Sequence, residues 1–290
     1  MFDFIKTQHR KRHLARHPIP DAIWRQVIQL PLFMGLSGEE RQRLREQAAW
    51  FLHKKSIVCV DGLELSDADR VMLAAQAVLP ILNLGFDAYD DWHEVIVYPG
   101  QFLSRDRYTD HFGLVHEYEQ ILAGQARSDG PVLLSWLDVS QSAWLDGWNV
   151  VIHEFAHKLD MRDGAPNGRP PLHAGMNAAQ WKAVFSRAFS NLSRLAHTGE
   201  YSPIDLYAAE NPAECFAVLS EYFFETPHAI AEHYPEVYQQ LRQFYQQDPL
   251  SRLPRVRYRP AFEPLDLGPV AFDPLMNPGI LPTPAPGGWA

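Results

Sequence analysis

Two histidines and a glutamate stand close together in an apolar stretch near the middle of the 290-residue chain. Residues 150–159 have the sequence VVIHEFAHKL, which contains the pattern H-E-x-x-H. In a helix, His153 and His157 lie one turn apart on nearly the same face, so both imidazoles can reach one metal ion. Glu154 lies beside that face, where its carboxylate can take a proton from a water molecule. The pattern therefore predicts metal-assisted hydrolysis, and the alternative is a chance match in a core helix whose histidines are hydrogen bonded.

A catalytic zinc ion needs a third protein ligand and leaves its fourth position to water. A third histidine in the longer pattern H-E-x-x-H-x-x-G-x-x-H is excluded, because Asp160 and Asp163 occupy the positions of the glycine and the histidine. His173 and His197 are less well placed, since the first lies in a proline-rich stretch and the second near a predicted helix end. The third ligand is therefore sought among the carboxylates.

Glu214 is the best-placed carboxylate. It lies in the first turn of a helix that is predicted to begin after Asn211, and the apolar face of this helix would bring it beside the motif histidines. An acid at this position is also common as a simple helix cap. Among the nearby acids only Glu221 lies close to the same face as Glu214. The remaining rivals are Glu210 and Glu225.

Composition limits the class of protein. A hydrophobic fraction of 46% indicates a folded chain with a substantial core, and a formal net charge of −9 argues against binding nucleic acid through its phosphates. The N-terminus lacks a secretory signal, and no stretch approaches the roughly 18 apolar residues of a membrane span. The two cysteines, Cys59 and Cys215, make neither a disulfide framework nor a metal knuckle. We therefore expect a cytoplasmic protein that contacts neither nucleic acid nor membrane directly.

The first third of the chain contains few elements that could contribute to the site. Residues 1–17 carry a cluster of basic side chains and three histidines, and we expect a solvated, partly ordered tail there. Residues 19–30 have apolar side chains at helical spacing. Short strands are expected at 56–60 and 93–98.

Two capping boxes predict the main N-terminal helices. The sequence SGEE at 37–40 pairs a serine N-cap with a glutamate three residues later, and its helix should extend to about Lys54. The sequence SDAD at 66–69 has the same pattern with an aspartate, and Pro80 should kink or end the helix that follows. The first helix has many charges on its outer face, and the second carries an apolar stripe that should be buried.

A third strand is expected at 131–137, directly before the motif. In zinc peptidases of this type such a strand forms the sheet edge that binds an extended peptide, although an ordinary internal strand explains the same residues. Residues 108–127, before it, have a composition that predicts mixed loop and helix.

The motif helix is expected at 142–159, followed by a loop at 160–171 that is rich in glycine and proline. Further helices should begin after Asn177, after Asn211 and at 227–247. Together the elements predict an α+β fold that is mainly helical with a small mixed sheet.

We expect one main domain and two terminal segments. Residues 1–17 form the basic segment, and 18–248 form the domain, helical to about residue 90 and catalytic from about residue 91. Residues 249–290 contain ten of the 23 prolines, and no packed element persists at that density. An extended tail is expected there.

Two segments together resemble the Mlc titration factor A family of bacterial zinc peptidases. They are HEFAHKLD at 153–160 and NPAECFA at 211–217. This family is similar in its catalytic half to the peptidase domain of anthrax lethal factor, and the resemblance extends from about residue 18 to 255. It implies a zincin of the gluzincin type with one zinc ion per chain. The implied ligands are His153, His157 and Glu214, with Glu154 as catalytic base and Tyr207 as donor to the developing oxyanion.

The resemblance also implies two activities. One is hydrolysis of peptides, with aminopeptidase action favoured, and the other is binding of the glucose-responsive repressor Mlc, which relieves repression of sugar-uptake genes. The alternative is a regulatory protein that titrates the repressor and has weak or conditional peptidase activity. One departure concerns Val218, which stands where the thermolysin-like pattern has an aspartate that orients a histidine. The partners of the histidines are therefore unassigned, with Asp160 and Asp163 as candidates.

Overall fold

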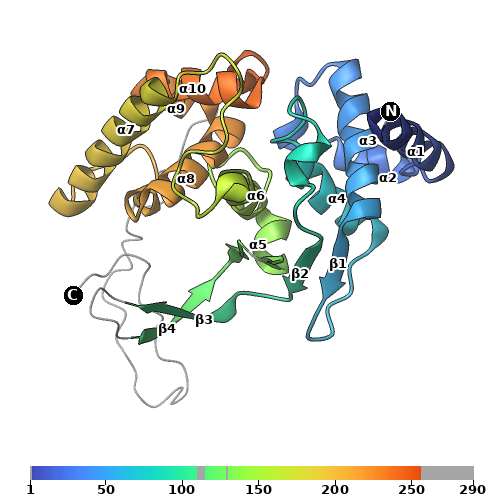
Figure 1. Ribbon diagram of the computed structural model, residues 1–290, viewed down its shortest axis with the longest axis horizontal. Coiled ribbons are helices and arrows are strands. Elements are labelled where there is room, and N and C mark those ends of the chain that lie inside the picture. The colour runs from blue at the N-terminus through green and yellow to red at the C-terminus, as the bar shows by residue number, and fades with distance from the viewer. Residues whose placement is uncertain (1, 110–114, 129, 256–290) are drawn as a thin grey trace, which may run out of the picture. The chain divides into compact units, whose positions relative to one another are not determined.

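The computed structural model describes residues 2–109, 115–128 and 130–255. The predicted tail at 249–290 lies outside the described residues from 256 onward. Its first residues are wrongly predicted as extended, because 249–251 form a short 3₁₀ helix and Pro249 and Leu253 are buried. Helices predominate, and the strands form one four-stranded sheet and one two-stranded hairpin. The prediction of a mainly helical α+β chain with a small mixed sheet is confirmed (Figure 1).

The four-stranded sheet has the order β1-β2-β6-β5. The strands are β1 (Ser56–Cys59), β2 (Glu94–Tyr98), β5 (Gly124–Ala126) and β6 (Val132–Ser135). The first three strands in this order are parallel, and β5 is antiparallel to β6. The strand predicted at 131–137 is therefore internal: of the two roles weighed for it, the internal strand is confirmed and the substrate-binding edge is wrong. The edge on this side of the sheet is β5, whose three residues lack any period-2 apolar pattern that would have indicated a strand.

The N-terminal helices follow their capping boxes. The helix α3 (Gly38–Lys54) has the reciprocal Ser37–Glu40 box, and α4 (Asp67–Val78) has the corresponding Ser66–Asp69 box. The helix α4 ends two residues before Pro80, as expected from the missing N–H of proline. The first predicted helix is α2 (Asp21–Val27).

Three predictions of local structure are wrong. Residues 2–16 form the helix α1 (Phe2–Arg16) instead of a tail, and the His13 ring stacks on that of His53 in α3 at 3.6 Å. Residues 102–109 and 115–122 form the antiparallel strands β3 (Phe102–Thr109) and β4 (Val115–Leu122) instead of loop and helix. The helix predicted at 227–247 is divided into α9 (Pro227–His233) and α10 (Pro235–Tyr245), because Pro235 cannot donate the helical hydrogen bond.

The motif helix α6 (Val150–Asp160) begins eight residues later than predicted. Ala143, Leu145 and Gly147 have positive φ angles of 78°, 62° and 94°, which no right-handed helix allows. Asn149 then caps α6, and its side chain accepts a hydrogen bond from the amide of Ile152 at 3.0 Å. A cap at this position sets the direction in which the histidines project.

The remaining elements lie on either side of α6 in the chain. The helix α5 (Trp136–Gln141) follows β6, and α7 (Ala178–Thr198) and α8 (Pro212–Glu225) follow the motif. The predicted caps Asn177 and Asn211 both accept hydrogen bonds from the first turns of α7 and α8. Short 3₁₀ helices complete the described chain: η1 (Pro31–Phe33), η2 (Phe86–Tyr89), η3 (Met161–Asp163), η4 (Leu206–Ala209) and η5 (Pro249–Ser251).

The helix α6 lies in the core, in contact with α8, α4 and the strands β5 and β6 (Figure 1). Each of its residues from Val150 to Asp160 is buried. Phe155 is fully enclosed, with its ring 5.4–5.7 Å from those of Phe51, Tyr89 and Trp92. Burial of such a side chain contributes roughly 1.5–3 kcal/mol. The opposite face of α6 carries the histidines, so the core holds that face in place. No helix in the described ranges is long and apolar enough to cross a membrane.

Candidate metal centre

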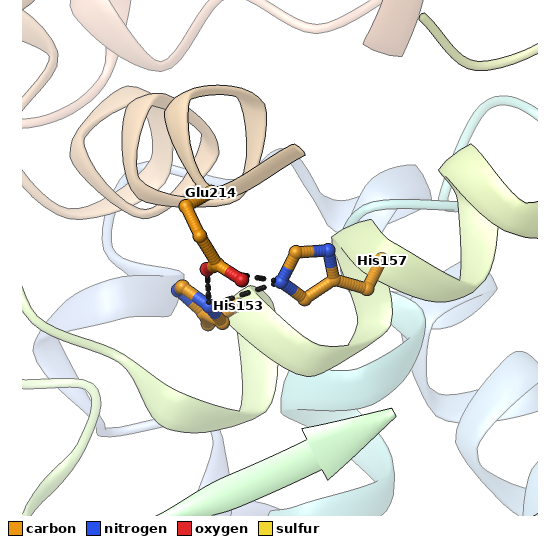
Figure 2. Close-up of side chains that lie close together, drawn as sticks. All are labelled: His153, His157 and Glu214. Carbon is orange, nitrogen blue, oxygen red and sulfur yellow. Dashed lines mark hydrogen bonds and ion pairs between the residues drawn. The ribbon is translucent and has the colours of Figure 1, made fainter. Parts of the chain in front are cut away.

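The structure brings together one donor atom from each of His153, His157 and Glu214 (Figure 2). The Nε2 atoms of the two histidines are 3.2 Å apart. Oε2 of Glu214 lies 2.9 Å from Nε2 of His153 and 3.2 Å from Nε2 of His157. The imidazoles project from successive turns of α6, and Glu214 approaches them from the first turn of α8. The Asn211 cap holds that turn in place through the amides of Ala213 and Glu214.

The spacing of these donors suits a tetrahedral metal ion. Two ligands that each lie 2.0–2.1 Å from zinc at the tetrahedral angle are roughly 3.3–3.4 Å apart. The observed separations of 2.9–3.2 Å are close to that value. The side chains of His153, His157 and Glu214 are only 11%, 9% and 16% exposed, so competition from bulk water is small. Three ligands with a fourth position for water form the arrangement of catalytic zinc sites.

The electrostatics of the cluster favour positive charge between the donors. Burial tends to raise the pKa of Glu214, but hydrogen bonds with His153 and His157 outweigh it and hold that pKa well below its usual range. Burial tends to lower the pKa of His153, but Glu221 and Glu214 together raise it well above the usual value. A cation placed among these groups is stabilised in the same way.

Glu221 orients the His153 ring through Nδ1, the nitrogen that does not face the other two donors. Its Oε1 lies 2.8 Å from Nδ1 of His153, and its Oε2 accepts a hydrogen bond of 2.6 Å from the amide of Asn149. Burial raises the pKa of Glu221, and His153 opposes that rise. The sequence indicated Glu221 only as a rival ligand. Its position seven residues after Glu214, two turns along the same face, was the signal that it belongs to this site.

The other predicted partners of the histidines take different positions. Oδ2 of Asp160 accepts hydrogen bonds of 2.7 Å from the amides of Asn167 and Gly168, so Asp160 holds the loop after the motif. Asp163 is exposed in η3. Within the described ranges, the buried Nδ1 of His157 has no hydrogen-bond partner. The site is therefore asymmetric, because only His153 has a carboxylate at its Nδ1 atom.

Glu154 and Tyr207 flank the three donors. Glu154 is buried and lies against β5; its burial raises the carboxyl pKa, and the neighbouring His153 and His157 counter that rise. Tyr207 lies in η4, and its ring is 6.0 Å from that of His153. The Tyr207 side chain is 48% exposed, and its partial desolvation together with the negative charges of Glu214 and Glu154 raises its pKa, so its hydroxyl keeps its proton throughout the neutral range. The described chain thus places a carboxylate and a hydroxyl beside the cluster.

Comparison with known proteins assigns the family. The model of the glucose-regulated metallo-peptidase M90 family matches residues 5–246, which include α6 and α8. The chain belongs to this family. Its membership in M90 makes the chain a metallopeptidase and indicates a metal ion at the centre described above.

Similar members of M90 bear the name Mlc titration factor A. The protein of Cronobacter sakazakii is 41% identical over 260 residues, covering 89% of this chain and 97% of the relative. The protein of Serratia proteamaculans is 42% identical over 239 residues, covering 81% and 91%, and that of Escherichia coli is 40% identical over 241 residues, covering 82% and 91%. The resemblance found from the segments at 153–160 and 211–217 is confirmed.

Proposed function

We propose that the chain is a zinc peptidase of the gluzincin type, with one zinc ion held by His153, His157 and Glu214. The convergence of their donor atoms at 2.9–3.2 Å is the observation that carries this proposal. Two neutral imidazoles and a carboxylate are a donor set that zinc accepts. When bound, zinc would lower the pKa of a coordinated water to about 7 and polarise the substrate carbonyl.

Glu154 and Tyr207 would supply the remaining chemistry. Glu154 takes the proton of the attacking water and passes it to the leaving amine, because its carboxylate is buried beside the donors and is not one of them. Tyr207 donates its hydroxyl hydrogen to the developing oxyanion, which its protonated state and its position beside His153 allow.

The substrate would bind as an extended strand along β5. Among the described residues β5 pairs within the sheet with β6 alone, and an extended peptide can pair with an edge strand of this kind. Glu154 lies directly against this strand. A peptide on β5 would therefore have a carbonyl close to the proposed base.

We propose aminopeptidase action on such peptides. The test compares short peptides that differ only in whether the N-terminus is free or acetylated, each with wild type and Glu154→Gln protein. Cleavage restricted to the first residue of free peptides supports the proposal. Equal cleavage of both sets at internal bonds contradicts aminopeptidase action but leaves the zinc peptidase proposal intact.

A second function rests on the names of the relatives. Because they are called Mlc titration factor A, we propose that this chain also binds an Mlc-type repressor and relieves repression of sugar-uptake genes. The alternative is that titration is the main function and that peptidase activity is weak or conditional. A pull-down of the repressor with wild type and Glu154→Gln protein separates binding from cleavage. Binding that depends on Glu154 would contradict two separable functions.

The proposal also covers the cellular compartment, the partners and the extent of the domain. We propose a cytoplasmic enzyme without direct nucleic-acid or membrane contacts, in which residues 18–248 form the peptidase domain. Both cysteines, Cys59 and Cys215, are free thiols, as a reducing compartment would keep them. The family match ends at residue 246, close to the proposed C-terminal boundary, and begins at residue 5, within α1.

The Tyr207→Phe protein should bind zinc normally and lose about 10²-fold in kcat, which is the usual cost of one oxyanion donor. The ring remains, so its packing beside His153 is kept. The measurement is steady-state cleavage together with zinc content. Tyr201→Phe is the matched control, because Tyr201 is 66% exposed and should tolerate the change. Equal kcat values for wild type and Tyr207→Phe would remove Tyr207 from the reaction.

The Glu221→Gln protein should bind zinc about 10–100-fold more weakly, the usual effect of losing a ligand's carboxylate partner. The glutamine amide cannot accept from both Nδ1 of His153 and the amide of Asn149, which now contact the two carboxylate oxygens. Competition with a fluorescent chelator measures the affinity. Glu39→Gln on the exposed face of α3 is the control. An unchanged zinc affinity would show that Glu221 does not orient the ligand.

A further inference from the structure

Gly124, the first residue of β5, packs directly on the Glu154 side chain. A Cβ atom built on Gly124 would lie 2.6 Å from Oε1, 2.7 Å from Cγ and 2.9 Å from Cδ of Glu154, whereas ordinary contacts begin at 3.4 Å. Gly124 lies in a β-strand and outside the left-handed region, so its backbone conformation would accept any residue. The absence of a side chain is therefore a requirement of space, imposed by Glu154.

The strand cannot easily move away from Glu154. Gly124 is paired with Leu134 in the ladder to β6, and the carbonyl of Ala123 accepts a hydrogen bond of 2.7 Å from the amide of Ser135. This ladder attaches the start of β5 to the interior of the sheet. A side chain at position 124 would have to displace several strand residues together, or else displace Glu154.

Lys158 attaches the chain that follows β5 to the motif helix. Its buried Nζ donates to the carbonyl oxygens of Arg127 at 2.6 Å and Gly130 at 2.9 Å. Glu154 and Lys158 are one helical turn apart, so both project from α6 toward β5 and the turn that follows it. The helix therefore holds the edge strand at two points, by contact at Gly124 and by hydrogen bonds from Lys158.

We infer that Gly124 is a positioning residue that holds the Glu154 carboxylate in place for proton transfer. This inference rests on the proposed function. The strand β5 contacts the Glu154 side chain and is also the proposed binding edge for a peptide. The same strand would therefore fix the positions of the substrate backbone and of the proton acceptor relative to each other. The backbone of β5 can lie this close to the Glu154 carboxylate only if residue 124 is glycine.

The first test is the Gly124→Ala protein loaded with zinc. The methyl group needs close to 1 Å of additional room, and a misplacement of about 1 Å in a catalytic group costs on the order of 10²-fold in rate. We expect kcat to fall by about that factor, with a smaller change in KM and unchanged zinc content. Gly100→Ala is the matched control, since a Cβ there meets no atom within 4 Å. An unchanged kcat for Gly124→Ala would overturn the inference.

The second test is a double-variant cycle with Glu154→Asp, which removes one methylene from the side chain that meets the new methyl. If the two positions act through their contact, the double variant should lose far less activity than the product of the two single losses. If the activity loss of the double variant equals the product of the two single losses, the two positions act independently and the inference is contradicted. This readout also distinguishes positioning from general damage to the fold, which a shorter side chain at position 154 would not repair.

A crystal structure of the zinc-loaded Gly124→Ala protein gives a readout that does not depend on activity. A displaced Glu154 carboxylate beside an unmoved β5 supports the inference, and a displaced strand beside an unmoved carboxylate overturns it. If wild type cleaves none of the peptides, the proposed function fails by itself, and this comparison still decides whether Gly124 positions Glu154.

Discussion

The Glu154→Gln protein should bind zinc as tightly as wild type and cleave peptides about 10²–10⁴-fold more slowly, which is the range for loss of a general base. Glutamine has nearly the same shape as glutamate, so the contact with β5 at Gly124 is kept. An amide cannot take a proton from water at neutral pH. The three proposed ligands are untouched, because Glu154 is not one of the converging donors.

Metal content and catalysis must be measured on the same samples. Bound zinc is determined by atomic absorption, and cleavage of a free-amino peptide is followed by chromatography. Thermal unfolding provides a further check, since removing a buried carboxylate whose pKa is raised by burial should not destabilise the fold. Full activity in the Glu154→Gln protein would exclude the proposed base, and loss of zinc would mean that Glu154 is itself a ligand.

Local signals explain which parts of the fold could be predicted from the sequence. The Ser37–Glu40 and Ser66–Asp69 boxes and the caps at Asn177 and Asn211 all use hydrogen bonds between residues two or three positions apart. Such bonds require no knowledge of the rest of the chain. For this reason the starts of α3, α4, α7 and α8 were predicted well, including the helix that carries Glu214, whereas the start of α6 was not.

Weak local signals and distant contacts explain what could not be predicted. The strand β5 pairs with β6 shortly after it in the chain, but its sequence Gly-Gln-Ala has low strand propensity. The segment before α6 resembles a helix in composition, yet the amide of Leu145 donates to the buried Glu225, 80 residues away. That contact accompanies left-handed backbone at Ala143 and Leu145, which no local pattern indicates.

The metal centre could be predicted from the sequence only in part. Helical spacing alone placed His153 and His157 on one face, because their separation is a property of α6. The approach of Glu214 depends on how α8 packs on α6, so sequence reasoning could rank it above its rivals without excluding them. The role of Glu221 required the ring orientation of His153, which is visible only once both helices are in place.

The His153→Ala protein should lose both zinc and activity. If the roughly 10–16 kcal/mol with which zinc-finger peptides bind zinc is shared among four ligands, one ligand contributes about 2.5–4 kcal/mol. Its loss weakens binding about 10²–10³-fold. Activity should fall at least as far, because the remaining groups cannot activate water at neutral pH.

The structure adds a cost in stability to this substitution. Removing the imidazole leaves the buried Glu221 carboxylate with the amide of Asn149 as its remaining partner at this end of α6. An uncompensated buried charge costs several kcal/mol unless the carboxyl group binds a proton. The melting temperature of the His153→Ala protein should therefore fall, and it should fall less at low pH, where Glu221 is neutral.

His197→Ala is the matched control for His153→Ala. His197 is exposed in α7 and was also weighed as a third ligand from the sequence. Isothermal titration with zinc, peptide cleavage and thermal unfolding should leave this control equal to wild type. If His197→Ala loses zinc while His153→Ala retains it, the ligand set proposed from the converging donors is wrong.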